Sequence, residues 1–270
     1  MADLRIQLAY IGKHTLCRMQ ELDAVNLGKV VTLLLEVIVQ SNAQVFSVTA
    51  KERHAMVNKL KVIWHSIMSS LRMICGQSEL ACTVLNRNSN RPDFAKSLIS
   101  IAEYCQVYGP TNKELIPLLM DTLVVIGDLT ASEGFKETTF FVENNLFSIL
   151  KTCLDSPAIS SLENYNVSSG HTGISKPNAA SHAGLNPEID LSELTKDKFQ
   201  ETIMWTIANA VADEQACQQV FLDKHSKLMR MCFELLENDN PKIKEDVCHM
   251  IDNLFMYEHI KRYLFGGKGK

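Results

Sequence analysis

The chain has 270 residues, of which 46% are hydrophobic and 21% are charged. A chain of this length and composition can bury a sizeable core, but it exceeds one compact bundle unless its helices repeat along an axis. The net charge of −4 and the pI of about 6.1 provide no overall positive field that would attract a phosphate backbone. Nucleic acid is therefore not the partner that we expect.

The eight cysteines form no C-x-x-C pair, and most of them lie in apolar helical patterns. This usage is typical of reduced thiols and predicts a cytoplasmic or nuclear location. The first residues show no basic start followed by an uninterrupted apolar stretch, so we expect no secretory signal. The longest apolar run, near Val30 to Val39, contains Thr32 and Glu36 and is shorter than the ~20 residues that span a bilayer. We therefore expect no membrane partner.

Helical periodicity runs through most of the first 154 residues, and strand-like alternation is hard to find. One apolar stripe contains Trp64, Ile67, Leu71 and Ile74, and a second runs from Leu115 to Leu129. The sequence therefore predicts an all-α fold. The helices expected in this part of the chain lie at 3–21, 25–42, 52–76, 79–87, 93–108, around 115–129, 135–144 and 146–154.

Residues 155–196 change in character, with three prolines, several glycines, many serines and asparagines, and almost no apolar periodicity. We interpret this range as a disordered insertion loop within one repeat. Removing roughly 40 of the 81 positions between Asp128 and Asn209 restores one repeat period. The organisation predicted is thus degenerate repeats over 1–154, the insertion over 155–196, and further repeats of the same array over 197–265.

The C-terminal part shows a cadence of long, short, medium and long helices, expected at 197–212, 213–223, 225–238 and 241–257. Trp205 and Asn209 are four positions apart, which places both side chains on one helix face. Asn253 follows Asn209 by 44 residues, a typical spacing for helical repeats. His249 stands four residues before Asn253, as Trp205 does before Asn209, and Asp128 takes the place of the asparagine in an earlier copy.

The segment Met204–Ala210, with its Trp205 and Asn209, resembles the third-helix signature of armadillo repeats, most closely the pair that lines the peptide groove of importin-α. The resemblance implies a right-handed α-solenoid of armadillo-like repeats with a concave groove. It also implies that an extended partner peptide would contact Trp205, Asn209, His249, Asn253 and Asp128. An asparagine amide can bond to both N–H and C=O of a peptide, and an indole can form a flat apolar wall.

Other interpretations of the same residues stand beside this one. Trp205 can belong to the core, and Asn209 and Asn253 can bond to the backbone of the neighbouring repeat. The charged residues Glu245, Asp246 and Asp252 are interpreted as a solvated helix face.

The function that we expect is a non-catalytic adaptor or scaffold that holds an extended or helical segment of a partner protein in a concave groove. Two alternatives are a self-assembling module that stacks through its terminal repeats and a nucleic-acid-associated repeat protein that uses local basic residues such as Lys51 and Arg53. No H-E-x-x-H, G-x-x-x-x-G-K or G-x-S-x-G motif and no metal-ligand spacing occurs in the sequence. We therefore expect neither enzymatic activity, nor a cofactor, nor a metal.

Overall fold

The computed structural model describes residues 24–77, 79–89, 91–132, 138–162, 194–212 and 215–256. All regular secondary structure in these ranges is helical, which confirms the all-α class. The expected helix at 3–21, most of the insertion and the tail after residue 256 lie outside the described residues. The helices are α2 (Ala24–Phe46), α3 (Ala50–Gln77), α4 (Glu79–Ser89), α5 (Pro92–Tyr108), α6 (Leu115–Thr130), α7 (Thr138–Glu143), α8 (Leu146–Leu154), α9 (Pro157–Ser160), α11 (Lys196–Ala210), α12 (Gln215–Lys224), α13 (Ser226–Glu234), the 3-10 turn η3 (Leu235–Glu237) and α14 (Pro241–Phe255).

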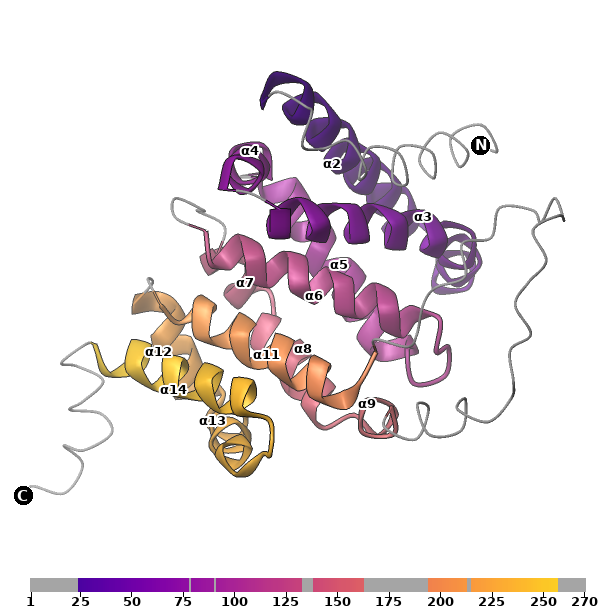
Figure 1. Cartoon of the computed structure of the whole chain (residues 1–270). Helices are drawn as coiled ribbons and strands as arrows, with labels where there is room; N and C mark the ends of the chain where they lie inside the picture. The colour runs from indigo at the N-terminus through magenta and orange to yellow at the C-terminus, as the bar shows by residue number, and fades with distance from the viewer. Residues whose placement is uncertain are drawn as a thin grey trace, which may run out of the picture.

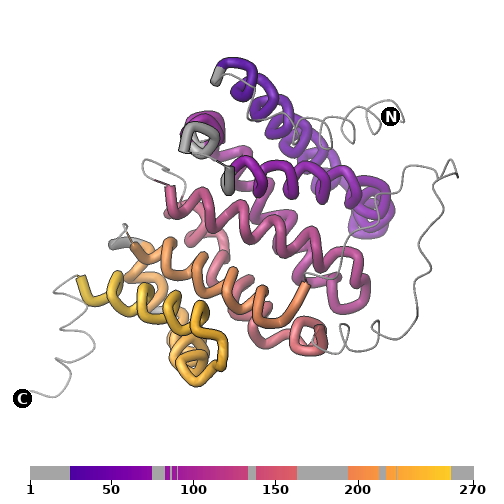
Figure 2. The backbone as a smooth tube through the Cα atoms, in the orientation of Figure 1, coloured from indigo at the N-terminus to yellow at the C-terminus, as the bar shows by residue number. Residues whose placement is uncertain are grey.

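Four long helices, α3, α6, α11 and α14, lie side by side in chain order, and each packs against the next (Figure 1). Other helices, among them α5, α7, α8, α12 and α13, form a second layer behind them (Figure 2). The core lies between the layers because the apolar stripe of each of these four helices faces the second layer and the neighbouring helices. The predicted stripe of Trp64, Ile67, Leu71 and Ile74 is fully buried. The Trp64 indole N–H donates to Ser41 Oγ at 2.8 Å.

The two C-terminal long helices begin at caps that the sequence encodes. The Thr195 hydroxyl accepts a hydrogen bond from the Lys198 N–H at 3.1 Å. The Asn240 side chain accepts from the Lys242 N–H at 2.9 Å, and Pro241 occupies the first turn, where its missing N–H has no structural consequence. The helix predicted to begin at residue 241 does begin there.

The start of the predicted insertion is folded. Residues 155–162 contain α9, and Ile159 and Leu162 are buried against the core. The interpretation of residues 155–162 as part of a loop was wrong. Pro157 was counted as evidence for a loop, but a proline in the first turn of a helix is compatible with the start of that helix. Residues 163–193 of the insertion lie outside the described residues.

Among the described residues, one helix is long and apolar enough to cross a membrane by length and composition, namely Val25–Phe46, with 33% of the tested window buried. This helix, α2, packs against α3, α4 and α5.

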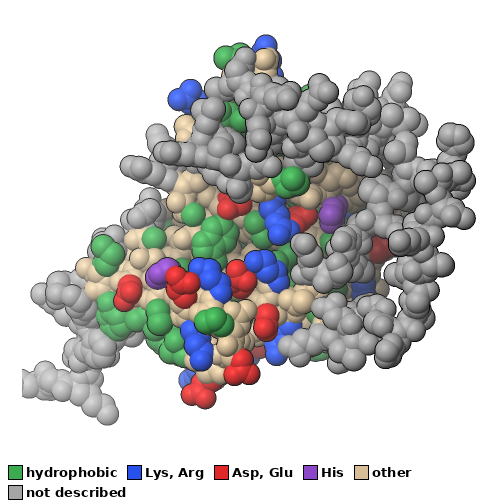
Figure 3. All heavy atoms as spheres, viewed as in Figure 1, with side chains coloured by type: hydrophobic (Ala, Val, Ile, Leu, Met, Phe, Trp, Pro, Cys, Tyr) green, Lys and Arg blue, Asp and Glu red, His purple; other side chains and the backbone are tan. Residues whose placement is uncertain are grey.

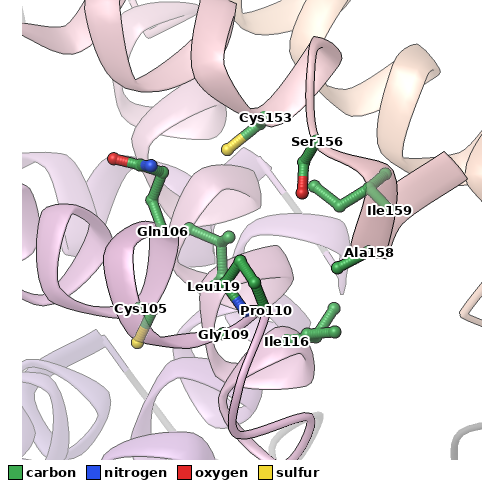
Figure 4. Close-up of a pocket in the computed structure, with 10 residues that line it drawn as sticks. All are labelled: Cys105, Gln106, Gly109, Pro110, Ile116, Leu119, Cys153, Ser156, Ala158 and Ile159. Atoms are coloured by element: carbon green, nitrogen blue, oxygen red, sulfur yellow. The ribbon is translucent and has the colours of Figure 1, made fainter.

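Two buried cysteines, Cys105 on α5 and Cys153 on α8, line a small cavity between these helices and α9 (Figure 4). The cavity encloses about 10 Å³, the space of about one water molecule, so it does not hold an organic ligand. Both thiols are free. Burial raises the pKa of Cys105 well above its usual range and the pKa of Cys153 to about 12.

We expect the exposed and the buried thiols of the protein to differ in their reaction with an alkylating agent. Cys248 is exposed and should react with iodoacetamide in the native protein, whereas Cys105, Cys153, Cys217 and Cys232 are buried and should react only after unfolding. Burial also raises the pKa of Cys232 to about 12, which suppresses the reactive thiolate. Peptide mass spectrometry with and without guanidinium measures the difference. Rapid native labelling of Cys105 or Cys153 would contradict the packing of α5 on α8.

Candidate functional site

The structure brings the five predicted site residues to three adjacent helices. Asp128 lies on α6, Trp205 and Asn209 lie on α11, and His249 and Asn253 lie on α14. His249 is exposed, and the other four residues are half-buried. We call this surface the α6–α11–α14 face. Figure 3 shows the side of the molecule on which the long helices lie, where acidic and basic side chains alternate over α11 and α14, with hydrophobic side chains among them.

The two asparagines make the same contact to the preceding long helix. Asn253 Nδ2 donates to the Ala208 carbonyl at 3.0 Å, and Asn209 Nδ2 donates to the Gly127 carbonyl at 3.4 Å. Ala208 directly precedes Asn209, and Gly127 directly precedes Asp128. Each asparagine therefore bonds to the residue before the equivalent position of the previous copy, so the structure aligns Asp128, Asn209 and Asn253 in one register.

These bonds match the interpretation in which the asparagines bond to neighbouring backbone, but they use only part of each amide. The acceptor is a carbonyl oxygen, so the contacting atom must be the amide nitrogen. Among the described residues no donor is bonded to Oδ1 of Asn209 or Asn253. Because both residues are half-buried, Oδ1 and the second N–H of each amide remain for a ligand or water.

Trp205 lies against the backbone of α6. A Cβ placed on Gly127 would stand 2.5 Å from Trp205 Cζ3, 2.7 Å from its Cε3 and 2.8 Å from Thr206 Oγ1. The six-membered part of the indole therefore occupies the space that any larger residue at 127 would need. Trp205 is half-buried, so it serves the contact between α6 and α11 and also presents surface on the α6–α11–α14 face.

A second pair of equivalent positions was missed by the sequence reasoning. Lys198 pairs with Glu201 at 3.1 Å on α11, and Lys242 pairs with Glu245 at 3.0 Å on α14. The pair on α14 follows the pair on α11 by 44 residues, the same distance by which Asn253 follows Asn209. Aligning the two helices at this offset would have revealed a shared order of Lys, Glu, Trp or His, and Asn. Such partly exposed pairs contribute little stability but fix the charge pattern of the face.

The contact between α3 and α6 contains a buried carboxylate that sequence spacing does not reveal. Asp121 is 5% exposed and accepts from Arg72 Nη1 at 3.0 Å, while His65 Nε2 lies 3.7 Å away. Burial lowers the pKa of His65, an effect that Asp121 opposes and Arg72 reinforces. The arginine therefore balances the carboxylate, and the pairing arises only because two helices about 50 residues apart in the chain pack together.

Asp246 corrects the interpretation of the acidic residues on α14. Glu245 and Asp252 are exposed as expected, but Asp246 is only 1% exposed. It lies on the same side of the helix as Ile243, Val247 and Met250, all of which are buried.

In the described ranges, no group of three or more His, Cys, Asp or Glu is arranged to hold a metal ion. Comparison of the chain with protein-family models, with curated proteins and with solved structures finds no match in any of the three.

The close contact at Gly127 gives a matched pair of predictions. Gly127→Ala should destabilise the protein by about 1–3 kcal/mol because the new methyl group overlaps the Trp205 ring. At Gly28 a Cβ would meet its nearest neighbours at 3.8 and 3.9 Å, so Gly28→Ala should be neutral or should stabilise by up to about 1 kcal/mol. Urea denaturation followed by circular dichroism measures both. Equal effects of the two substitutions would show that α11 does not approach α6 this closely.

Proposed function

We propose that this protein is a non-catalytic adaptor of the cytoplasm or nucleus, built as a right-handed, armadillo-like α-solenoid. In this proposal, an extended segment of a partner protein binds along the α6–α11–α14 face. The observation that carries the proposal is the repeated amide contact, in which Asn209 and Asn253 bond at equivalent positions to the preceding helix.

These contacts support binding because they orient the amides before a ligand arrives. A side chain that is already fixed loses less conformational entropy when it binds a peptide. Each oriented amide offers an acceptor and a donor, the two groups that an extended backbone requires. Asp128 offers acceptors only, so the α6 position would favour a donor of the partner.

The neighbouring residues give this row of amides side walls. The Trp205 ring, seated on Gly127, provides an apolar surface beside Asn209, and the exposed His249 occupies the equivalent place beside Asn253. The Lys198–Glu201 and Lys242–Glu245 pairs lie about two to three helical turns before the asparagines on the same helices. A partner segment would thus meet amides, aromatic rings and paired charges in the same order on α11 and α14.

The test uses a phage-displayed library of random peptides, selected on the immobilised full chain, followed by affinity measurement with the selected peptide. Replacing both Asn209 and Asn253 by Ala should weaken binding about 5- to 150-fold, since each lost hydrogen bond contributes roughly 0.5–1.5 kcal/mol. The inter-helix bonds are lost as well, so the variant should also lose about 1–3 kcal/mol of stability. Titration calorimetry is therefore performed where circular dichroism shows the variant fully folded.

Asn238→Ala is the matched control. Asn238 also links two elements, donating to Gln200 Oε1 at 3.0 Å, but it lies outside the three equivalent positions. It should lose stability without losing affinity. If the folded double variant binds the selected peptide as tightly as the unmodified chain, the asparagines serve only the packing and the groove proposal is wrong.

The alternative of self-assembly is favoured by exposed hydrophobic side chains near the C-terminal end of the described chain. Phe233 and Leu236 are each 37% exposed, and Met256 is 73% exposed. If these residues mediate stacking, sedimentation velocity should show a concentration-dependent oligomer that Leu236→Ser weakens. A monomer at every concentration would leave the adaptor as the only function proposed.

A further inference from the structure

The contact between α11 and α14, which we call the α11–α14 seam, differs electrostatically from the contact between α3 and α6. The seam contains the bond from Asn253 to Ala208. Asp246 stands seven residues before Asn253 on α14, and Glu201 stands seven residues before Ala208 on α11. Because both helices run in the same register, the seam brings these two carboxyl groups to facing positions.

Asp246 is buried in this seam without full compensation. Its side chain is 2% exposed, and its Oδ2 has no hydrogen-bond partner among the described residues. The nearest cation is Lys242, whose Nζ lies 3.6 Å from Oδ1, beyond normal hydrogen-bond length, and bonds instead to Glu245 at 3.0 Å. An ionised carboxylate in this position is unfavourable because it has left water without gaining equivalent partners.

Asp121 occupies the position on α6 that is equivalent to Asp246 on α14, and its negative charge is compensated. Asp121 stands seven residues before Asp128, as Asp246 stands before Asn253. The preceding long helix supplies Arg72 to Asp121 at 3.0 Å. In the α11–α14 seam the preceding helix supplies Glu201 instead. Asp121 therefore has an opposite charge beside it, whereas Asp246 has a like charge.

We propose that the α11–α14 seam is a proton-dependent junction, in which uptake of a proton from solvent by the Asp246 carboxyl tightens the packing of α14 and loss of that proton loosens it. Protonation removes the buried charge and the repulsion from Glu201, and it converts an oxygen without a partner into a hydroxyl donor.

The groups around Asp246 act on its pKa in both directions, and the net effect is a rise. Burial raises its pKa above the usual 3.8, Lys242 and His249 on its own helix oppose the rise, and Glu201 across the seam and Glu245 add to it. The folded protein therefore binds this proton more tightly than the unfolded chain does. The contribution to stability is present below pH 3.8 and is lost as the pH rises through the raised value.

The seam proposal stands whether or not the face binds a peptide. Its effect on binding rests on the proposed function, since Asn253 belongs to both the seam and the α6–α11–α14 face. If that function is correct, acidification would strengthen the last position of the groove.

Thermal unfolding of the full chain and hydrogen exchange of α14 test the seam directly. Asp246→Asn imitates the protonated side chain and should raise Tm by about 2–4 °C near neutral pH, with slower exchange in α14. The gain should shrink as the pH approaches 3.8. Glu201→Gln removes the facing charge and also the ionic partner of Lys198, but that partly exposed pair contributes little stability, so the variant should give a gain of the same sign. The Glu201→Gln variant also tests the seam proposal if Asp246→Asn fails to fold.

Asp121→Asn is the control. Its carboxylate is paired with Arg72, so its neutralisation should lower Tm at neutral pH. The proposal is overturned if neither Asp246→Asn nor Glu201→Gln raises Tm at neutral pH. It is also overturned if the gain in Tm near pH 3.8 is the same as the gain at neutral pH. These measurements involve no peptide, so their outcome is independent of the binding test.

Discussion

The close approach of α6 and α11 at Gly127 joins the two described parts of the chain that flank residues 163–193. The Trp205 ring and the Thr206 hydroxyl occupy the space where a Cβ at position 127 would lie. This contact brings the backbones close enough for Asn209 to reach the Gly127 carbonyl. The close packing of α11 against α6 at this point therefore requires a residue without a Cβ at position 127.

The amides on this face combine a structural and a potential recognition role. One N–H of each asparagine satisfies a carbonyl of the preceding helix, and each of the two residues is half-buried. An amide that is held at one end and open at the other resists rotation, which suits it to recognise a backbone. The same two contacts set the register of α11 against α6 and of α14 against α11.

Each contact between neighbouring long helices has its own electrostatic character. Asp121 and Arg72 balance one another between α3 and α6, whereas Asp246 faces Glu201 between α11 and α14. In a stack where each helix contacts mainly its neighbours, such local differences produce local differences in stability. Under the seam proposal, α14 is the helix whose packing would respond to its charge state.

The sequence by itself determined the helical class and the positions of most helices, because apolar periodicity and capping residues act locally. Trp205, Asn209 and Asn253 were also found from spacing, since residues four apart share a helix face. Only the tertiary structure decided how these side chains are used. The acceptors of the asparagines lie 45 and 82 residues away, and the burial of Asp246 depends on other elements packing against α14. No local pattern contains such contacts, because they arise only when separate helices pack together.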